Sequence, residues 1–286
     1  MKQSNAITID VEDYFQVSAF ENTIDRNNWD NLEHRVSANI DQSLQVLSDH
    51  SVKATFFTPC WVAERYPNIV TKIIENGHEL ARHGYGHQRV TDLDREAFKA
   101  DLIKAKDILE NISGQAIAGY RAPSYSIGKS NIWALEVLAE TGHSYSSSIY
   151  PIQHDHYGYP EAPRFTFQDE KSGMIEIPIT TVRVMNRLFP AGGGGFFRFY
   201  PYALSRWMIN RVNLKEGQSC VFYLHPWELD PGQPRQKNIS AKTRVRHYLN
   251  LHKTEGRLKQ LLQDFSWGRV DEVFIKNKNI PLHILS

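Results

Sequence analysis

The chain has 286 residues, and its composition is that of an ordinary globular protein, with 41% hydrophobic and 23% charged residues. A formal net charge of +1 gives no reason to expect nucleic acid as a partner. No apolar run approaches the roughly 18 residues that span a bilayer, and the first residues lack the apolar segment of a signal peptide. We therefore expect a cytoplasmic protein with no transmembrane segment. The only cysteines, Cys60 and Cys220, lie in strand-like surroundings and are expected to be buried thiols.

Strand-like and helix-like segments alternate along the first half of the chain. In chain order we expect a strand over 6–11, a helix over 36–47, a strand over 54–57, a helix over 69–74, a long amphipathic helix over 94–112 and a helix over 132–138. Gly77, Gly114 and Gly142 follow the last three and are expected to end them. This alternation predicts parallel strands joined by crossover helices, in a barrel or an open sheet.

The pattern changes from about Pro151. Four glycines over 192–195 predict a loop, residues 220–224 predict an apolar strand, and residues 243–265 predict a helix whose Arg and Lys side chains face solvent. No internal repeat or low-complexity linker divides the chain. We therefore expect a single domain over 1–286, with core motifs in 1–150 and an elaborated C-terminal part in 151–286.

Three acids follow the first expected strand, in the stretch from Ile7 to Phe15 that reads ITIDVEDYF. Side chains alternate faces along a strand, so Asp10 and Glu12 share one face if the strand persists, while Asp13 turns away. Neighbouring carboxylates repel one another and are costly to bury, which a bound cation or a shared proton would relieve. The alternative is that Glu12 or Asp13 only caps the next turn.

A His-x3-His pair lies in the stretch RHGYGH, where His83 and His87 flank two glycines. Gly84 and Gly86 make a helix implausible, but a tight loop can still direct both imidazoles at one ion. Two imidazoles and one carboxylate form the ligand set of a catalytic metal that keeps open positions for water. The alternative is a pair of surface histidines.

Two further residues stand out at strand ends or in loops, where active sites gather in parallel α/β folds. Arg121, in the loop GYRAPS, can pair with a carboxylate and lower its pKa, or can be an ordinary surface arginine. His225, in YLHPWE, follows the late apolar strand and is suited to act as a general acid, or can be a hydrogen-bonded core histidine.

Together these stretches resemble the NodB-type polysaccharide deacetylases, carbohydrate esterase family 4 (CE4). The resemblance is carried by residues 8–15, 53–57, 77–87, 120–125 and 223–228. Residues 192–194, followed by Phe197 and Arg198, and residues 246–248 resemble the C-terminal extension of the branch associated with exopolysaccharide and exosortase gene systems.

The resemblance implies a distorted (β/α)7-like barrel and metal-dependent hydrolysis of N-acetyl groups on the amino sugars of a polymer. By position, it implies that Asp10 is the catalytic base and that His83 and His87 bind the metal. It also implies that Arg121 orients Asp10 and that His225 is the general acid.

The acidic metal ligand stays open between Glu12 and Asp13. Relatives with an Asp-x-Asp pattern favour Glu12, which has this spacing from Asp10. The backbone N–H of Ser124 is expected to complete an oxyanion hole, and Tyr125 and Trp227 are expected to contact the substrate.

One divalent ion is expected, Zn²⁺ first, with Co²⁺, Ni²⁺ or Mn²⁺ as alternatives. The expected substrate is an N-acetylated glycan, and a peripheral association with a polysaccharide assembly system fits the branch. Two other functions remain open at this point: a metal-dependent hydrolase of small cyclic amides or ureides, and a catalytically silent carbohydrate-binding protein.

Overall fold

The computed structural model describes residues 3–154, 157–276 and 279–285. The strands lie, in chain order, over Ser4–Asp10 (β1), Thr55–Thr58 (β2), Glu79–Arg82 (β3), Gly119–Tyr120 (β4), Tyr145–Ser146 (β5), Phe167–Asp169 (β6), Ile175–Glu176 (β7), Thr181–Val184 (β8), Arg187–Pro190 (β9), Val221–Leu224 (β10), Ser266–Gly268 (β11) and Leu282–His283 (β12). The helices lie over Val36–Asp49 (α1), Cys60–Arg65 (α2), Pro67–Glu75 (α3), Arg95–Ser113 (α4), Ala134–Glu140 (α5), Gly194–Phe199 (α6), Tyr202–Asn210 (α7), Ala241–Tyr248 (α8) and Leu251–Asp264 (α9).

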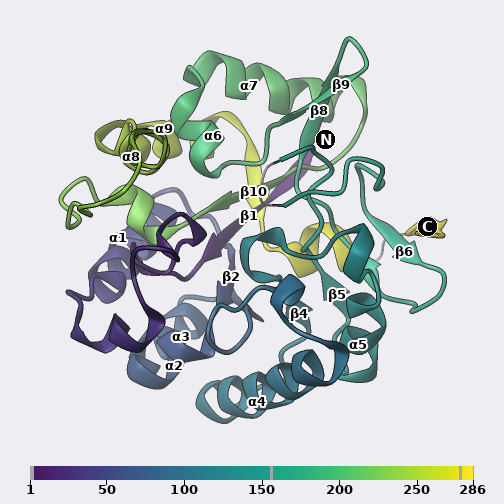
Figure 1. Ribbon diagram of the computed structural model, residues 1–286. Helices are drawn as coiled ribbons and strands as arrows, with labels where there is room; N and C mark the ends of the chain where they lie inside the picture. The colour runs from purple at the N-terminus through teal and green to yellow at the C-terminus, as the bar shows by residue number, and fades with distance from the viewer. Residues whose placement is uncertain (1–2, 155–156, 277–278, 286) are drawn as a thin grey trace.

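One large sheet runs through the molecule in the order β10-β1-β2-β3-β4-β5-β7-β6-β12, and β11 also pairs with β1. Its neighbours are parallel except for β6 and β7, and β8 and β9 form a separate antiparallel hairpin. Helices α1 to α5 lie around the outside of β1 to β5 (Figure 1). The predicted α/β class, with parallel strands joined by crossover helices, is confirmed.

Strand β1 lies at the centre of the site-bearing part of the sheet. Its residues from Asn5 to Asp10 are all buried, because β10 and β2 flank it and both of its faces are covered. In register, Ile9 lies opposite Leu224 of β10, and Asp10 lies opposite Phe57 of β2. Parallel pairing therefore brings the chain that leaves β1, β2 and β10 to one edge of the sheet.

Most predicted elements are confirmed to within about two residues at their ends. Helix α4 shows the local reasons. Asp94 caps its first turn by accepting a hydrogen bond from the N–H of Ala97, and Gly114 ends it in the left-handed region at φ 68°. Its apolar stripe, which includes Phe98 and Leu102, packs into the core.

The single helix predicted over 243–265 is wrong. The chain forms α8 and α9 instead, and they are separated at Asn250, which has a φ of 54° and donates from Nδ2 to the carbonyl of Arg198 at 2.8 Å. The predicted solvent-facing role is also wrong for Arg257, whose Nη1 donates to the carbonyls of Phe197, Arg198 and Tyr200 at 3.0, 2.9 and 3.2 Å. Both side chains fix the end of α6.

The glycine run over 192–195 is more than a loop, because α6 begins at Gly194. Gly193 pairs with Tyr223 of β10, and a Cβ at Gly193 would lie 2.1 Å from the Tyr223 carbonyl oxygen. Gly193 also has a φ of 113° and a ψ of −149°, a conformation that only glycine readily adopts. The run therefore lets α6 start directly against β10.

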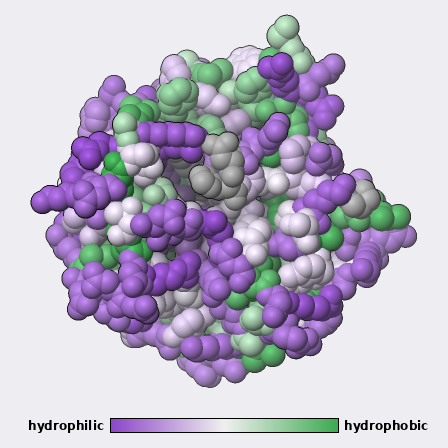
Figure 2. All heavy atoms as spheres, viewed as in Figure 1, coloured by the Kyte–Doolittle hydropathy of each residue, from purple (hydrophilic) through white to green (hydrophobic). Residues whose placement is uncertain are grey.

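Cys60 and Cys220 are free and buried, as predicted. Among the residues that the structure describes, no helix has both the length and the apolar character required to cross a membrane. The face shown in Figure 2 is mainly hydrophilic, with apolar side chains scattered over it.

Candidate active site

The acidic end of β1 turns sharply as it leaves the sheet. Asp10 is the last residue of the strand, the N–H of Val11 donates to the carbonyl of Phe57 at 2.8 Å, and the N–H of Glu12 donates back to the carbonyl of Asp10 at 2.8 Å. Asp10 and Glu12 are both buried, and together with His225 they place three ligand-type atoms within 4.8 Å of one another. The predicted shared position of Asp10 and Glu12 is therefore found, although the strand itself ends at Asp10.

Glu12 lies between the two histidines of the His-x3-His pair. Its Oε1 is 3.1 Å from Nε2 of His83 and 2.9 Å from Nε2 of His87, and all three side chains are buried. Burial by itself would raise the pKa of Glu12, but His87, His225 and His83 together hold it well below its usual value. Burial lowers the pKa of His87, which favours the neutral imidazole that binds metals.

The protonation pattern of His83 fits a bound cation. Its Nδ1 lies 2.8 Å from the carbonyl oxygen of Arg121, an acceptor, so this nitrogen carries the proton. In the neutral ring, Nε2 is then a bare lone pair that faces the carboxylate of Glu12. Two lone pairs that face each other at this distance repel, and a cation bound between them would remove the repulsion. A backbone carbonyl that accepts from the other ring nitrogen, here Nδ1, is typical of metal-binding histidines. Glu12, His83 and His87 therefore fit a divalent ion.

The loop between the two histidines is held from several sides. Gly84 has a φ of 71°, and the carboxylate of Asp101 accepts from the N–H of Tyr85 at 3.2 and 3.3 Å. His87 itself has a φ of 55°, unusual for a residue other than glycine. Its carbonyl accepts from Nη2 of Arg26 at 2.8 Å, which stabilises this conformation. The sequence offered no signal for Arg26.

Asp13 lies apart from this cluster. Its Oδ1 accepts from the N–H of Tyr14 at 2.8 Å, and its Oδ2 accepts from the N–H groups of Arg35 and Val36 at 2.7 and 2.9 Å. The carboxylate thus holds the start of α1, which is the capping role left open as an alternative. As a candidate metal ligand Asp13 is corrected here, because both of its oxygens face backbone donors and Glu12 is the acid that faces the histidines.

Asp10 is held by a buried arginine. Nη1 of Arg121 donates to Oδ1 of Asp10 at 2.6 Å and to Oγ1 of Thr8 at 2.7 Å. The same guanidinium donates from Nε to the carbonyl of Ser147 at 3.0 Å, so its plane is fixed. The other oxygen of Asp10, Oδ2, accepts from the hydroxyl of Tyr125 at 3.3 Å. Arg121 is therefore the buried partner of Asp10, not a surface arginine.

His225 reaches the same centre from the end of β10. Its Nε2 lies 4.0 Å from Oδ2 of Asp10 and 3.8 Å from Oε1 of Glu12. Its Nδ1 lies 2.8 Å from Oε1 of Glu228 and donates to it. Burial lowers the pKa of His225, but Glu12, Glu228 and Asp10 outweigh it and raise the pKa to about 9. The ring is thus a protonated group that faces the two acids.

The three residues expected to contact substrate have different surroundings. Ser124 is partly exposed, has a φ of 56° and shares a short hydrogen bond with Ser18 between their hydroxyls. Tyr125 is buried and uses its hydroxyl on Asp10. Trp227 is 4% exposed and its indole is stacked against the rings of His225 and His247, so it supports these rings, and its contact with the substrate stays a prediction.

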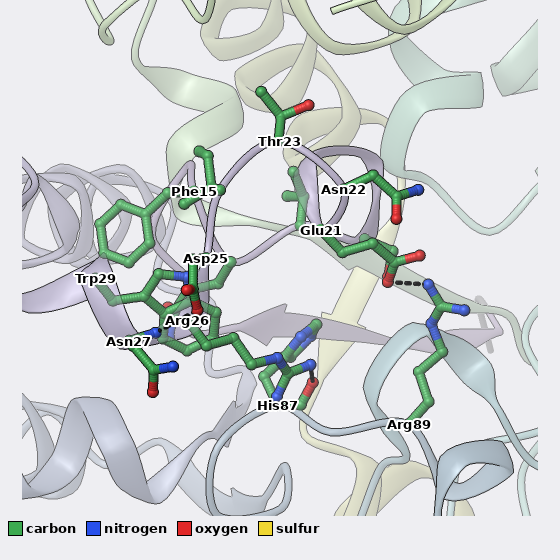
Figure 3. Close-up of a pocket in the computed structure, with 14 residues that line it drawn as sticks. Phe15, Glu21, Asn22, Thr23, Asp25, Arg26, Asn27, Trp29, His87 and Arg89 are labelled. Atoms are coloured by element: carbon green, nitrogen blue, oxygen red, sulfur yellow. Dashed lines mark hydrogen bonds and ion pairs between the residues drawn. The ribbon is translucent and has the colours of Figure 1, made fainter.

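A pocket of about 590 Å³ opens beside His87. It is lined mainly by the segment between β1 and α1, residues 15–29. Figure 3 shows Arg26 reaching the carbonyl of His87 on one side and the ion pair between Glu21 and Arg89 on another. The pocket is thus bordered by the same loop that carries His87.

The two halves of the chain match two family models. Residues 23–146 match the polysaccharide deacetylase family, and residues 147–275 match a domain of unknown function, DUF3473. Asp10 and Glu12 precede the first matched segment, and His225 lies in the second.

Two curated relatives each match about a third of the chain. A peptidoglycan-N-acetylglucosamine deacetylase from Bacillus cereus is 35% identical over 94 residues, which are 32% of this chain and 34% of that protein. A chitooligosaccharide deacetylase from Azorhizobium caulinodans is 31% identical over 95 residues, 33% of this chain and 42% of that protein. The matched region thus spans well under half the length of these two relatives.

Solved structures share the fold over the whole chain. A presumed polysaccharide deacetylase from Mycobacterium smegmatis has a TM-score of 0.65 at 18% identity, with coverage of 100% of this chain and 94% of that one. A CE4-family pseudoenzyme from Bacillus anthracis has a TM-score of 0.50 at 14% identity, with coverage of 99% and 70%. The fold is thus the distorted barrel expected from the resemblance.

Proposed function

We propose that this chain, whose residues 23–146 match the polysaccharide deacetylase family, removes N-acetyl groups from the amino sugars of a glycan by metal-dependent hydrolysis. The observation that carries the proposal is the position of Glu12 Oε1 between Nε2 of His83 and Nε2 of His87. A base-type carboxylate and an acid-type imidazole, those of Asp10 and His225, reach the same point.

Glu12, His83 and His87 would hold the ion. Two imidazoles and a carboxylate suit Zn²⁺ first, and Co²⁺, Ni²⁺ or Mn²⁺ also accept them. When bound, such an ion acidifies a water molecule and polarises the acetyl carbonyl.

Asp10 and His225 would move the protons. Arg121 donates to Oδ1 of Asp10, so Oδ2 is the oxygen that takes a proton from the attacking water. His225 donates the proton of its Nε2 to the sugar nitrogen as the C–N bond breaks, which releases the free amine and acetate. Glu228, which accepts from Nδ1 of this ring, helps to keep it protonated by raising its pKa. The backbone N–H of Ser124 is proposed as a further donor to the carbonyl oxygen.

The resemblance to the exopolysaccharide branch supports a polymeric substrate of that kind, and a peripheral association with its assembly system belongs to the same proposal. The cytoplasmic location stays a prediction. The names of the relatives, peptidoglycan-N-acetylglucosamine and chitooligosaccharide deacetylases, support N-acetylglucosamine as the sugar to test first.

Acetate release from chitooligosaccharides and peptidoglycan fragments tests the proposal. We expect the zinc-loaded protein to release acetate, a chelator to stop the release, and zinc to restore it. The Asp10→Asn variant should bind zinc like the wild type and release acetate at least about 100-fold more slowly. Zinc binding with no acetate from any N-acetylated glycan would refute the proposed activity.

A further inference from the structure

A buried ion pair lies directly behind His225. Nε of Arg198, in α6, donates to Oε2 of Glu228 at 2.6 Å, and the two side chains are 3% and 0% exposed. Nη1 of Arg198 also donates to the carbonyls of His247 and Leu249 at 2.6 and 3.1 Å. The guanidinium is therefore fixed by three acceptors from two separate parts of the C-terminal half.

Glu228, whose position is fixed by Arg198, in turn fixes His225. While Oε2 is held by Arg198, Oε1 accepts from the backbone N–H of His225 at 3.1 Å and from Nδ1 of its ring at 2.8 Å. Burial would raise the pKa of Glu228, but Arg198 and His225 lower it to about 2, so the acceptor stays ionised. One carboxylate thus fixes both the backbone and the ring of His225.

The face of the His225 ring is supported as well as its edge. Trp227 stacks against it with ring centres 5.2 Å apart and planes 22° apart. Trp227 also stacks on His247, with ring centres 4.3 Å apart and planes 14° apart. Arg198 lies over the same indole at 5.3 Å, and Gln233 accepts from Nε2 of His247 at 2.6 Å. With its edge and one face fixed, the imidazole can only direct Nε2 towards Asp10 and Glu12.

The residues behind His225 come from the part of the chain that matches the domain of unknown function. Helix α6 begins at the glycine run that touches β10, and Phe197 packs on Phe222 of β10 with ring centres 4.9 Å apart. Figure 1 shows α6, α8 and α9 on the same side of the molecule, beside β10. Arg198 joins these helices to the turn that carries Glu228.

We propose that Arg198 is a positioning residue of the catalytic centre, which acts through Glu228 to hold the His225 imidazole with Nε2 facing the reacting bond. On this view, residues 147–275 complete the active site and are not an accessory attached to it. The effect of Arg198 on the rate of deacetylation rests on the function proposed above. Its geometric part, the fixed ring of His225, is independent of that function.

The Arg198→Met variant tests the proposal. Without Arg198, the Glu228 carboxylate loses the donor that fixes its second oxygen, and the ring of His225 loses its defined orientation. We expect kcat on an N-acetylated oligosaccharide to fall about 10–100-fold with KM within about threefold of wild type. Zinc affinity should not change, because Arg198 does not contact Glu12, His83 or His87.

A spectroscopic measurement separates this proposal from the activity. In the metal-free protein, the Nδ1–H resonance of His225 in a nitrogen-15 NMR spectrum should be protected from exchange with water, and Arg198→Met should abolish that protection. If the wild type shows the protected signal but releases no acetate, the proposed function fails while the positioning role stands.

Two further variants serve as controls. Arg164→Met removes a partly buried ion pair with Glu216 in the same half of the chain and should leave kcat and the signal unchanged. The double variant Arg198→Met/Glu228→Gln leaves no unpaired buried charge, so it keeps the test available if the single variant does not fold. We expect its kcat to stay at least about tenfold low. A wild-type kcat and a protected Nδ1–H in either Arg198 variant, or an equal kcat loss in Arg164→Met, would overturn the proposal.

Discussion

Glu12 and Asp13 are neighbours in the chain, yet replacing each by alanine should change a different property: the stability of the fold for Asp13 and the affinity for zinc for Glu12. Asp13→Ala removes an acceptor from three backbone N–H groups at 2.7 to 2.9 Å. At about 1.5 kcal/mol for each hydrogen bond to a charged acceptor, the free energy of unfolding should fall by about 4.5 kcal/mol. Zinc affinity should not change. Glu12→Ala should instead weaken zinc binding by at least about 100-fold, because it removes a ligand.

Two measurements distinguish these outcomes. Denaturant unfolding in the presence of chelator gives the free energy of the metal-free fold, and calorimetric titration with Zn²⁺ gives the affinity. Asp94→Ala is the matched control for Asp13→Ala: it removes one capping hydrogen bond at the start of α4 and should cost about 1 kcal/mol. If Asp13→Ala lost zinc binding with its stability intact, or if Glu12→Ala kept full affinity, the division of roles between the two acids would be wrong.

Three further outcomes are expected. Burial and Arg82 lower the pKa of His143 from 6.5 to about 3, so this residue contributes stability that is present above pH 6.5 and lost as the pH falls towards 3. Between pH 6 and pH 4 the unfolding free energy of the wild type should therefore fall by about 1.4 kcal/mol per pH unit more than that of His143→Gln; parallel curves would contradict this. Gly193→Ala should destabilise the fold by about 3 kcal/mol in denaturant titrations, because its Cβ would meet the Tyr223 carbonyl at 2.1 Å. Gly195→Ala, whose Cβ would lie 3.7 Å from Nη2 of Arg198, should be nearly neutral. Zinc at 100 times its dissociation constant should raise the unfolding free energy by about 2.7 kcal/mol, and a chelator should reverse the gain; an unchanged unfolding midpoint would argue against a site that forms only in the folded protein.

Local patterns in the sequence predicted the elements that depend on local causes. Periodic apolar residues, the Asp94 cap and the terminal Gly114 all act within one or two helical turns, so α4 was predicted almost to its ends. Asp10 and His225 were likewise predicted to lie at strand ends from local patterns, the apolar runs that precede them. Each short motif was ambiguous alone, and the combination pointed to one edge of a parallel sheet.

The remaining features depend on contacts between distant parts of the chain. Asp13 caps α1 through the N–H groups of Arg35 and Val36, more than twenty residues away, and no local rule selects those partners. Trp227 was expected to contact the substrate, and no local pattern shows that the distant His247 stacks on its ring. The break between α8 and α9 depends on the hydrogen bond from Asn250 to a carbonyl in α6. The periodicity of apolar residues in the sequence could not reveal this distant contact.

The pairing of β1 has a consequence for how the protein is made. Strand β1 pairs with β2, about 50 residues away, but also with β10, whose register joins Ala6 to Val221, and with β11 near the end of the chain. During synthesis the first strand therefore has an unpaired, apolar edge until more than 200 further residues have been added, and such an edge invites pairing with other chains. Glu12, His83 and His87 emerge early and can meet an ion, but His225 arrives late. On the proposed function, the metal site would therefore form before the catalytic centre is complete.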